Sequence, residues 1–409
     1  MIYLRAIRNV PGINASAIPL YLPPDDTNRE SGLDKNVFFG AISMYLREKV
    51  PFLRNMPAIL DKVLDSGPML RMAARRSGTT NTEGLEDMTL SMIKGENAFP
   101  EKELKRLVKY LNENGKPDVI HLSNALIIGL ARQLKRYLDV KIVCSLLNED
   151  DWIDEMAEPY RSDAWKLISE EAANVDTFIT PSNYYKEIFV SKTGYSGNNV
   201  HIVPLAVDTR NLNILPKKDN YPAVGYFSRI NSPNGFDKLV DAFIRLKTSN
   251  KLPGLTLHVS GGFTGSDKSF IAEQIRKIKS HGLKSFIRIY PEFQGNSKEE
   301  FFSSIDLMSV PVRKHDGYGL YILEANAAGV PVVQPETGAF PEIIAKTKGG
   351  ITYSPDNIEE LAAALVRLFE DNSLRASLGE AGKENVLKEL SLSGMSAGLE
   401  IVYNETMRK

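Results

Sequence analysis

The sequence has one cysteine, no long apolar run and almost no net charge. Cys144 lies within the apolar run 140–147, so we expect a buried strand residue rather than a nucleophile. A single cysteine excludes a disulfide within the chain, which suits a reducing cytoplasm. The 50 Lys and Arg residues nearly match the 51 Asp and Glu residues, so no electrostatic attraction to nucleic acid is predicted.

Two further absences narrow the class of protein. No stretch of 18 apolar residues occurs and the N-terminus lacks a signal-peptide pattern, so we expect a cytoplasmic protein that neither spans a membrane nor is exported. The sequence contains no Asp-x-Asp pair, and its five histidines are scattered without the spacing of a zinc site. No metal site is therefore predicted.

Length and pattern together predict two α/β domains. At 409 residues the chain is long enough for two cores. Regular alternation of strands and helices predicts two Rossmann-like domains, each with a doubly wound parallel sheet. The expected boundaries are a first domain at 1–205, a polar linker at 206–221, a second domain at 222–390 and a C-terminal helix at 391–409.

The expected strands have definite positions in both halves. In the first domain they are 16–21, 118–122, 140–147, 177–180 and 201–205. In the second domain they are 223–227, 256–260, 286–290, 307–312, 330–334 and 350–353.

The segment Asp316-Gly-Tyr-Gly-Leu-Tyr-Ile-Leu-Glu324 carries the most chemical information. It places a glycine-bearing loop and a helix between two of the expected strands, and Glu324 shares the face of that helix with Leu320, Leu323 and Ala327. A carboxylate on an apolar face is costly unless it is hydrogen-bonded. Glu324 therefore either pairs with a structural arginine or a backbone amide, or binds ligand hydroxyls at the carboxyl edge of a parallel sheet.

This segment is followed by Gly-Val-Pro-Val-Val at 329–333 and by Thr-Gly-Ala-Phe-Pro-Glu-Ile at 337–343. Together they resemble the nucleotide-sugar site of GT-B glycosyltransferases, specifically glycosyltransferase family 4. The first acid of the motif, usually Glu, is Asp316 here. The resemblance implies two domains facing one another across a cleft, with the last helix crossing back onto the first domain.

The first domain departs from that family in two ways. An apolar first strand and a glycine-rich loop are expected at its start, but residues 1–8 look like the helix that would follow them. Either the first strand is absent or the chain begins late, and a strand at 1–7 is the alternative. The second departure is a helical insertion at about 27–117.

Part of this insertion is basic. Residues 41–77 hold seven Lys and Arg against three Asp and Glu, a surplus of four positive charges. A basic amphipathic segment can make weak contact with an anionic membrane surface, and the alternative is a solvated hairpin that covers the acceptor cleft. Residues 78–97 are expected to form a flexible lid or loop.

Transfer from a nucleotide sugar requires stabilisation of a diphosphate leaving group. The resemblance implies that Ser228 and Arg229 meet the diphosphate, and a surface arginine without a role is the alternative. Five positions further on, Asn234 stands where the family has a lysine, so one positive charge is missing. Arg313, Lys314 or helix N-termini could replace that charge.

The resemblance also assigns the remaining donor contacts. Glu324 would bind the ribose, Asp316 the transferred sugar, and the amides of Gly319 and Leu320 the phosphates, while Tyr290 would lie near the base. The residues expected to act in catalysis are Arg229, Asp316, Glu324 and His121.

Acceptor-side residues are expected in the first domain. His121 and Ser123 end one expected strand, and Glu149 and Asp150 follow the next. His121 either has a functional role or is a satisfied strand-end histidine, and the acidic run either orients an acceptor hydroxyl or is a solvated loop.

The resemblance implies a retaining glycosyltransferase, and the lack of an Asp-x-Asp pair predicts that it needs no metal. It would move a sugar from a nucleotide diphosphate sugar to a glycan, glycolipid or small-molecule acceptor, as a hexosyltransferase in polysaccharide biosynthesis. The alternative is a non-catalytic GT-B partner or scaffold in glycan assembly, which Asn234 and the missing first strand favour. No cofactor is expected, and the protein would be cytoplasmic, with peripheral contact at the inner membrane face.

Overall fold

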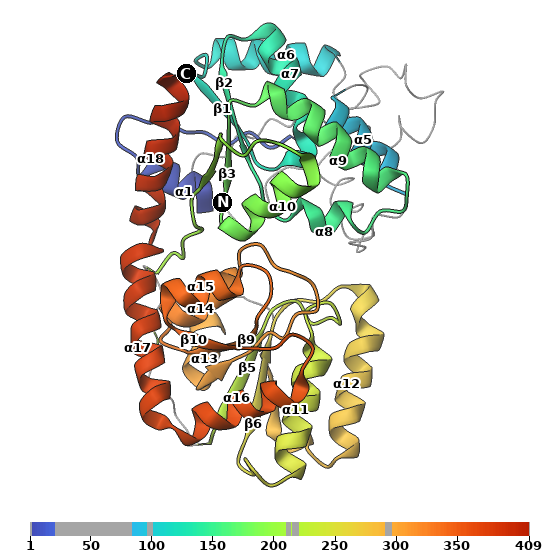
Figure 1. Cartoon of the computed structure of the whole chain (residues 1–409), viewed down its shortest axis with the longest axis vertical. Coiled ribbons are helices and arrows are strands. Elements are labelled where there is room, and N and C mark those ends of the chain that lie inside the picture. The colour runs from blue at the N-terminus through green and yellow to red at the C-terminus, as the bar shows by residue number, and fades with distance from the viewer. Residues whose placement is uncertain are drawn as a thin grey trace.

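The computed structural model describes residues 2–20, 84–95, 101–209, 214, 221–290 and 297–408. Two separate sheets, one of four strands and one of six, form the centres of two α/β domains (Figure 1). All the strand pairs within the two sheets are parallel. The predicted fold class, two Rossmann-like domains, is confirmed.

The second sheet has the strand order β10-β9-β8-β5-β6-β7. Its strands are β5 (Ala223–Phe227), β6 (Thr256–Ser260), β7 (Ile287–Tyr290), β8 (Leu307–Met308), β9 (Val332–Pro335) and β10 (Gly350–Tyr353). The chain builds outward from β5 to β7 and then returns to place β8 on the other side of β5. The strand order therefore reverses between β5 and β8, and open α/β sheets bind ligands outside the carboxyl ends of their strands at such a switch point.

Helices cover the second sheet because apolar residues recur on one face of each. They are α11 (Phe236–Thr248), α12 (Lys268–Ser280), α13 (Ser297–Ser304), α14 (Leu320–Ala327), α15 (Phe340–Thr347) and α16 (Ile358–Glu370). Helix α11 buries Leu239, Val240 and Phe243 in the same core as the strand residues Val224 and Tyr226. The buried faces of the strands are continuous apolar runs, as expected for a parallel sheet covered on both sides.

The first sheet has the strand order β1-β2-β3-β4. Its strands are β1 (Val119–Leu122), β2 (Lys141–Ser145), β3 (Thr177–Thr180) and β4 (Val200–Ile202), and its helices are α5 (Glu86–Lys94), α6 (Glu101–Glu113), α7 (Gly129–Tyr137), α8 (Glu149–Ile153), α9 (Tyr160–Glu171) and α10 (Asn183–Thr193). Cys144 is buried in β2. Among the described residues, no strand precedes β1.

The two ends of the chain meet on the first domain. Helix α17 (Asn372–Glu389) packs on α14 of the second domain, and α18 (Leu392–Arg408) continues along the first domain (Figure 1). Leu399 and Val402 of α18 share a buried cluster with Val143 and Ile179 of the first sheet. Helix α1 (Ile2–Arg8) packs against α18, so residues from both ends of the chain complete this face of the sheet.

The helix expected at the start of the chain is confirmed at residues 2–8, so the alternative of a strand at 1–7 fails. Two other expectations for the first domain are wrong. Residues 16–20 form no strand beyond a single bridge at Ala17, because Pro19 has no backbone N–H to donate to a ladder. The segment 78–97 is not a loop throughout, since residues 86–94 form α5 and end at Gly95 in the left-handed conformation.

The described part of the predicted insertion belongs to the core. Ile93 of α5 and Leu104 and Leu107 of α6 are buried. Helix α5 approaches α7 so closely that a Cβ on Gly95 would lie 2.4 Å from the carbonyl oxygen of Gly129. The basic segment 41–77 lies outside the described residues.

Several predicted strands are shorter than expected, among them the strand expected at 140–147, which spans Lys141–Ser145. The strand expected at 307–312 ends at Met308, and the chain then passes through Pro311. The strand expected at 201–205 is β4, which ends at Ile202 before Pro204. In the part of the chain that the structure describes, no helix has the length and apolar character needed to cross a membrane.

Candidate functional site at the carboxyl ends of the two sheets

Two loops of the second domain flank the switch point. The loop after β5 carries Ser228, Arg229 and Asn234, and the loop after β8 leads through Asp316 to α14. Gly235, at φ 71°, lets these loops touch, since a Cβ there would lie 1.7 Å from the carbonyl oxygen of Pro311. The fold thus brings together residues that are far apart in the sequence.

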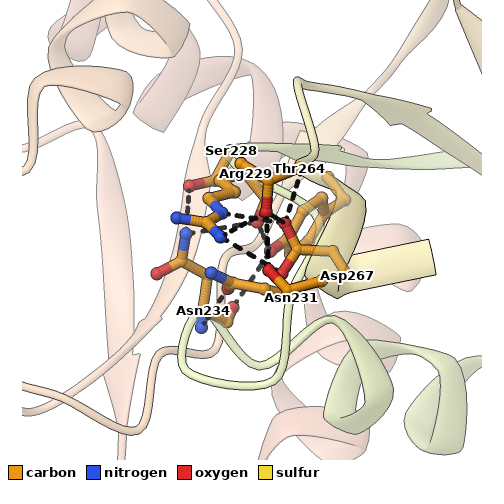
Figure 2. Close-up of polar contacts among 8 residues, drawn as sticks. Ser228, Arg229, Asn231, Asn234, Thr264 and Asp267 are labelled. Atoms are coloured by element: carbon orange, nitrogen blue, oxygen red, sulfur yellow. Dashed lines mark hydrogen bonds and ion pairs between the residues drawn. The ribbon is translucent and has the colours of Figure 1, made fainter. Parts of the chain in front are cut away.

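Arg229 is held by the start of α12 (Figure 2). Its Nε donates to Asp267 Oδ2 at 3.0 Å, and Nη2 donates to Asp267 Oδ1 at 3.2 Å and to Thr264 Oγ1 at 2.9 Å. Thr264 and Asp267 form a reciprocal capping box. Burial pushes the pKa of Asp267 upward, but hydrogen bonds from Arg229 and Thr264 outweigh it and the pKa is lowered. The guanidinium is therefore fixed along one edge by an ionised carboxylate.

Asn234 braces the same loop. Its side-chain amide donates to Ser228 Oγ at 3.0 Å and to the carbonyl oxygen of Arg229 at 3.2 Å (Figure 2). The buried hydroxyl of Tyr226 also donates to the Arg229 carbonyl oxygen. The residue that replaces the family's lysine therefore fixes the backbone that carries Arg229, and it brings no charge.

Asp316 organises the start of α14. Its Oδ1 accepts hydrogen bonds from the amides of Tyr318 and Gly319, both at 3.0 Å. Gly319 lies in the left-handed conformation as the N-cap of α14, and Leu320 begins the helix and packs its side chain against two apolar clusters. The Gly319 amide, which the resemblance assigns to the phosphates, is thus already bonded to Asp316.

Glu324 forms an ion pair with Lys298 of α13, at 2.5 Å between Oε1 and Nζ. Both side chains are partly buried, with 17% of Glu324 and 31% of Lys298 exposed. Of the partners foreseen for Glu324, a structural arginine or a backbone amide, neither is present among the described residues. The partner of Glu324 is instead Lys298, a residue with no expected role in the site.

The other predicted donor residues are engaged within the second domain. The hydroxyl of Tyr290 lies 3.2 Å from His258 Nδ1, and its ring packs edge-on against Phe301. Arg313 makes an ion pair with Asp237 at the start of α11. The expectation that Arg313 stands in for the missing lysine at 234 therefore gains no geometric support.

Both ring nitrogens of His121 have partners within the protein. Its Nδ1 lies 2.5 Å from the hydroxyl of Tyr403 on α18, and Nε2 lies 2.7 Å from Ser145 Oγ. The ring of Tyr3 packs edge-on against it. Burial lowers the pKa of His121 to about 4, so the ring is neutral at pH 7. Of the two alternatives for His121, these contacts fit the satisfied strand-end histidine. Ser123, in contrast, is exposed at the end of β1.

Glu149 lies inside the first domain. Its two oxygens accept hydrogen bonds from the amides of Ala125 and Leu147, both at 2.8 Å, and from the Tyr185 hydroxyl at 2.7 Å. Burial raises the pKa of this carboxyl group, and the hydrogen bonds oppose the shift. Since 3% of the residue is exposed, it cannot reach an acceptor, and the expectation of an acceptor contact from Glu149 is wrong.

Asp150 and Asp151 lie at the start of α8. Burial raises the pKa of Asp150, and burial together with the negative charge of Asp150 raises the pKa of Asp151 to about 6. Lys314 lowers and Asp316 raises the pKa of Asp151, so charged groups of the second domain act on an acidic group of the first.

The loop before α14 is bonded to the first domain. The amide of Gly317 donates to Asn148 Oδ1 at 3.0 Å, and Ser182 Oγ donates to the Gly317 carbonyl oxygen at 2.6 Å. A Cβ at Gly317 would lie 2.3 Å from Asn148 Oδ1, so only glycine permits this approach. The loop that carries Asp316 therefore touches both domains at once.

Two charged contacts reinforce this junction. Both carboxylate oxygens of Glu342, at the start of α15, accept from the amide of Asn183 at 3.0 Å, and one also accepts from Tyr184 at 3.2 Å. This places a negative charge at the positive N-terminus of α10. Lys314 forms an ion pair with Glu155 of the first domain, so it too is already paired.

Sequence reasoning missed three residues of the site. Thr264 and Asp267 have the spacing of a capping box directly before a helix, and that signal was available in the sequence. Lys298 gave no such signal, because nothing in the sequence shows that the first turn of α13 lies beside α14.

The fold and this site define a class of protein: GT-B proteins, with two Rossmann-like domains and a ligand site at the switch point of the second. Two family models match the chain, "Glycosyl transferases group 1" over residues 207–385 and "Glycosyltransferase Family 4" over residues 93–211. The chain belongs to the group 1 glycosyltransferases with the GT-B fold.

Individual relatives resemble parts of the chain. The lipopolysaccharide core biosynthesis mannosyltransferase LpsB of Rhizobium meliloti is 28% identical over 45% of this chain and 52% of its own length. A GDP-mannose-dependent phosphatidylinositol monomannoside mannosyltransferase of Mycobacterium tuberculosis is 24% identical over 56% of this chain and 61% of its own length. The chain thus spans roughly half the length of these curated relatives.

Solved structures resemble the fold. Anabaena Alr3699/HepE in complex with UDP gives a TM-score of 0.65 at 16% identity, covering 80% of this chain and 98% of that chain. A glycosyltransferase from Rickettsia africae gives a TM-score of 0.64 at 15% identity, covering 97% of this chain and 100% of that chain.

Proposed function

We propose that this protein transfers a sugar from a nucleotide diphosphate sugar to a glycan, glycolipid or small-molecule acceptor. The observation that carries the proposal is the position of Arg229 and Glu324 on the two sides of the switch point, with both side chains partly exposed. An arginine fork suits a diphosphate, and a carboxylate suits sugar hydroxyls. The nucleotide-sugar and UDP ligands in the names of its relatives support this choice of donor.

Calorimetry with UDP and with GDP tests the proposal. We expect one of them to bind the wild type, and Glu324→Ala to weaken that binding about tenfold or more, because a hydrogen-bonded charged group is lost. Lys346→Met is a matched control, since Lys346 is an exposed residue on α15 of the same domain. Absence of binding to both nucleotides, or equal binding by Glu324→Ala, would contradict the proposal.

We further propose that the reaction retains the anomeric configuration and needs no metal. In the absence of a bound cation, Arg229 and the N-terminus of α14 would carry the leaving-group charge. Proton NMR of the first product formed identifies the anomer. Assay with and without EDTA tests the metal requirement, and loss of activity in EDTA that magnesium restores would contradict it.

A second candidate function is a non-catalytic partner in glycan assembly. The observation in its favour is the charge balance of the site, where Asn234 replaces a lysine and Arg229 and Lys298 are both paired with carboxylates. Asn234→Lys separates the two candidates. Turnover by the wild type with any nucleotide sugar excludes the second, and turnover only after this substitution supports it.

Contact with an anionic membrane surface through residues 41–77 also remains a proposal. It rests on the surplus of four positive charges in that segment.

A further inference from the structure

The ion pair between Glu324 and Lys298 lies at the centre of the proposed donor site, and it comes from two different helices. Glu324 is in the second turn of α14, and Lys298 is in the first turn of α13. Both flank the carboxyl end of β5, where Nζ of Lys298 lies 5.9 Å from the ring centre of Phe227. Phe227 in turn packs on Phe301 and Phe302 of α13. The ammonium group of Lys298 thus lies near a cluster of phenylalanine rings beside the switch point.

The pairing is unequal for the two carboxylate oxygens. Lys298 binds Oε1, while Oε2 makes no hydrogen bond within the described residues. With 17% of its side chain exposed, Glu324 is open enough for a ligand, and the ion pair with Lys298 is the contact that fixes its orientation. The result is a carboxylate with one oxygen held by Lys298 and the other available.

We propose that Lys298 is a positioning residue for nucleotide binding: it holds Glu324 through Oε1 so that Oε2 meets a ribose hydroxyl of the donor. This inference rests on the proposed function. The family motif contributes only Glu324 to ribose recognition, and this inference adds Lys298 to it. Lys298 acts through Glu324, and its loss leaves the carboxylate free to turn between the nucleotide and water.

Calorimetry with UDP and GDP tests this inference in four variants, Lys298→Met, Lys298→Arg, Glu324→Gln and the double variant Lys298→Met/Glu324→Gln. We expect Lys298→Met to weaken binding about tenfold and Lys298→Arg to stay within about threefold of the wild type, since arginine can also hold Oε1. The double variant should bind within about twofold of Glu324→Gln alone, because a positioning residue contributes nothing once its partner is gone. Lys346→Met is the control and should bind as the wild type does.

The outcomes are distinguishable. A Lys298→Met variant that binds like the wild type overturns the proposal. Additive losses in the double variant also overturn it, because they mean that Lys298 touches the nucleotide directly. If the wild type binds neither UDP nor GDP, the donor assignment itself fails, and the role of Lys298 fails with it. Thermal unfolding of each variant excludes a folding defect, and Lys298→Gln replaces the methionine variant if that one does not fold.

Discussion

The carboxyl edges of the two sheets carry similar polar and charged residues, but these side chains differ in how far they are exposed. In the first domain, Glu149 looks like a site residue, but it is 3% exposed and both of its oxygens accept hydrogen bonds within the protein. In the second domain, Arg229 and Glu324 are also paired, yet 29% and 17% of their side chains remain exposed. A polar residue at the end of a strand is therefore a candidate for ligand binding only where the tertiary structure leaves part of it accessible.

This difference divides the roles of the two domains. The second domain offers a cation and a carboxylate on either side of a switch point, and this is the arrangement on which the donor proposal depends. The first domain offers Ser123, Asp150 and Asp151, since Glu149 is buried and both ring nitrogens of His121 have partners within the protein. We expect its contribution to be acceptor contact, together with the hydrogen bonds by which Asn148 and Ser182 hold the Gly317 loop, rather than charge stabilisation.

The largest expected effect is on folding of the first domain. Glu149→Ala leaves two backbone amides and the Tyr185 hydroxyl without their partner, and each buried donor left unsatisfied costs about 1–3 kcal/mol. We expect a loss of about 3 kcal/mol or more in the free energy of unfolding, measured by urea denaturation. Glu324→Ala, which removes a partly exposed pair, should lose about 1 kcal/mol or less. Equal losses in the two variants would show that the two edges do not differ.

A second effect depends on pH and on His121. Its pKa in the folded protein is about 4, below the ordinary value of 6.5, so protonation opposes folding. The stabilisation from neutral His121 is present above pH 6.5 and is lost as the pH falls from 6.5 toward 4. A shift of this size corresponds to about 2–3 kcal/mol, reduced because the ring is not wholly enclosed.

Measurement against a His121→Gln variant isolates this contribution. Other groups that titrate in this range, including Glu149, are common to both proteins and cancel in the difference. The difference in the free energy of unfolding between the wild type and His121→Gln should become smaller as the pH falls from 6.5 to 4. A difference that does not change with pH would mean that His121 is accessible to water and free to take up a proton.

A smaller effect is expected at Arg229. Asp267→Asn keeps an oxygen for the Thr264 amide but removes the charge that fixes the guanidinium, so affinity for a nucleoside diphosphate should fall a few-fold, about 1 kcal/mol. Asp237→Asn is a matched control, because Asp237 pairs with Arg313 in a similar way at the start of α11. Tighter binding by Asp267→Asn would mean that the carboxylate competes with the diphosphate instead of orienting the arginine.

A separate effect concerns attachment to membranes, and it tests the first half of the chain independently of the donor site. Each cation near an anionic surface contributes about 1 kcal/mol, so a surplus of four supports weak, reversible binding. Changing Arg71, Arg75 and Arg76 to Glu should abolish sedimentation with anionic vesicles and leave nucleotide affinity intact. Binding of the wild type should also fall as salt rises. Equal sedimentation of wild type and variant would leave the segment as a cover for the acceptor cleft.

Much of the second domain could be predicted from the sequence. The strands at 223–227, 256–260 and 350–353 have the predicted bounds, because uninterrupted apolar runs between helices are typical of a parallel sheet. The secondary structure of the first domain is harder to predict from the sequence. Helix α5 lies in a segment whose polar residues predict a loop, and its packing against α7 and α9, with Ile93 buried in the core, favours the helix.

The sequence by itself determined the alternation of strands and helices, the family and the segment 316–324 as the centre of the site. These depend on periodicity and on local spacing, which a single chain displays directly. Only the tertiary structure decided that Glu149 is buried, that Asp267 holds Arg229 and that Lys298 pairs with Glu324. Each of these contacts joins residues from different helices, strands or loops. Which of these elements become neighbours depends on the strand order, and the residue spacing within one segment does not determine that order.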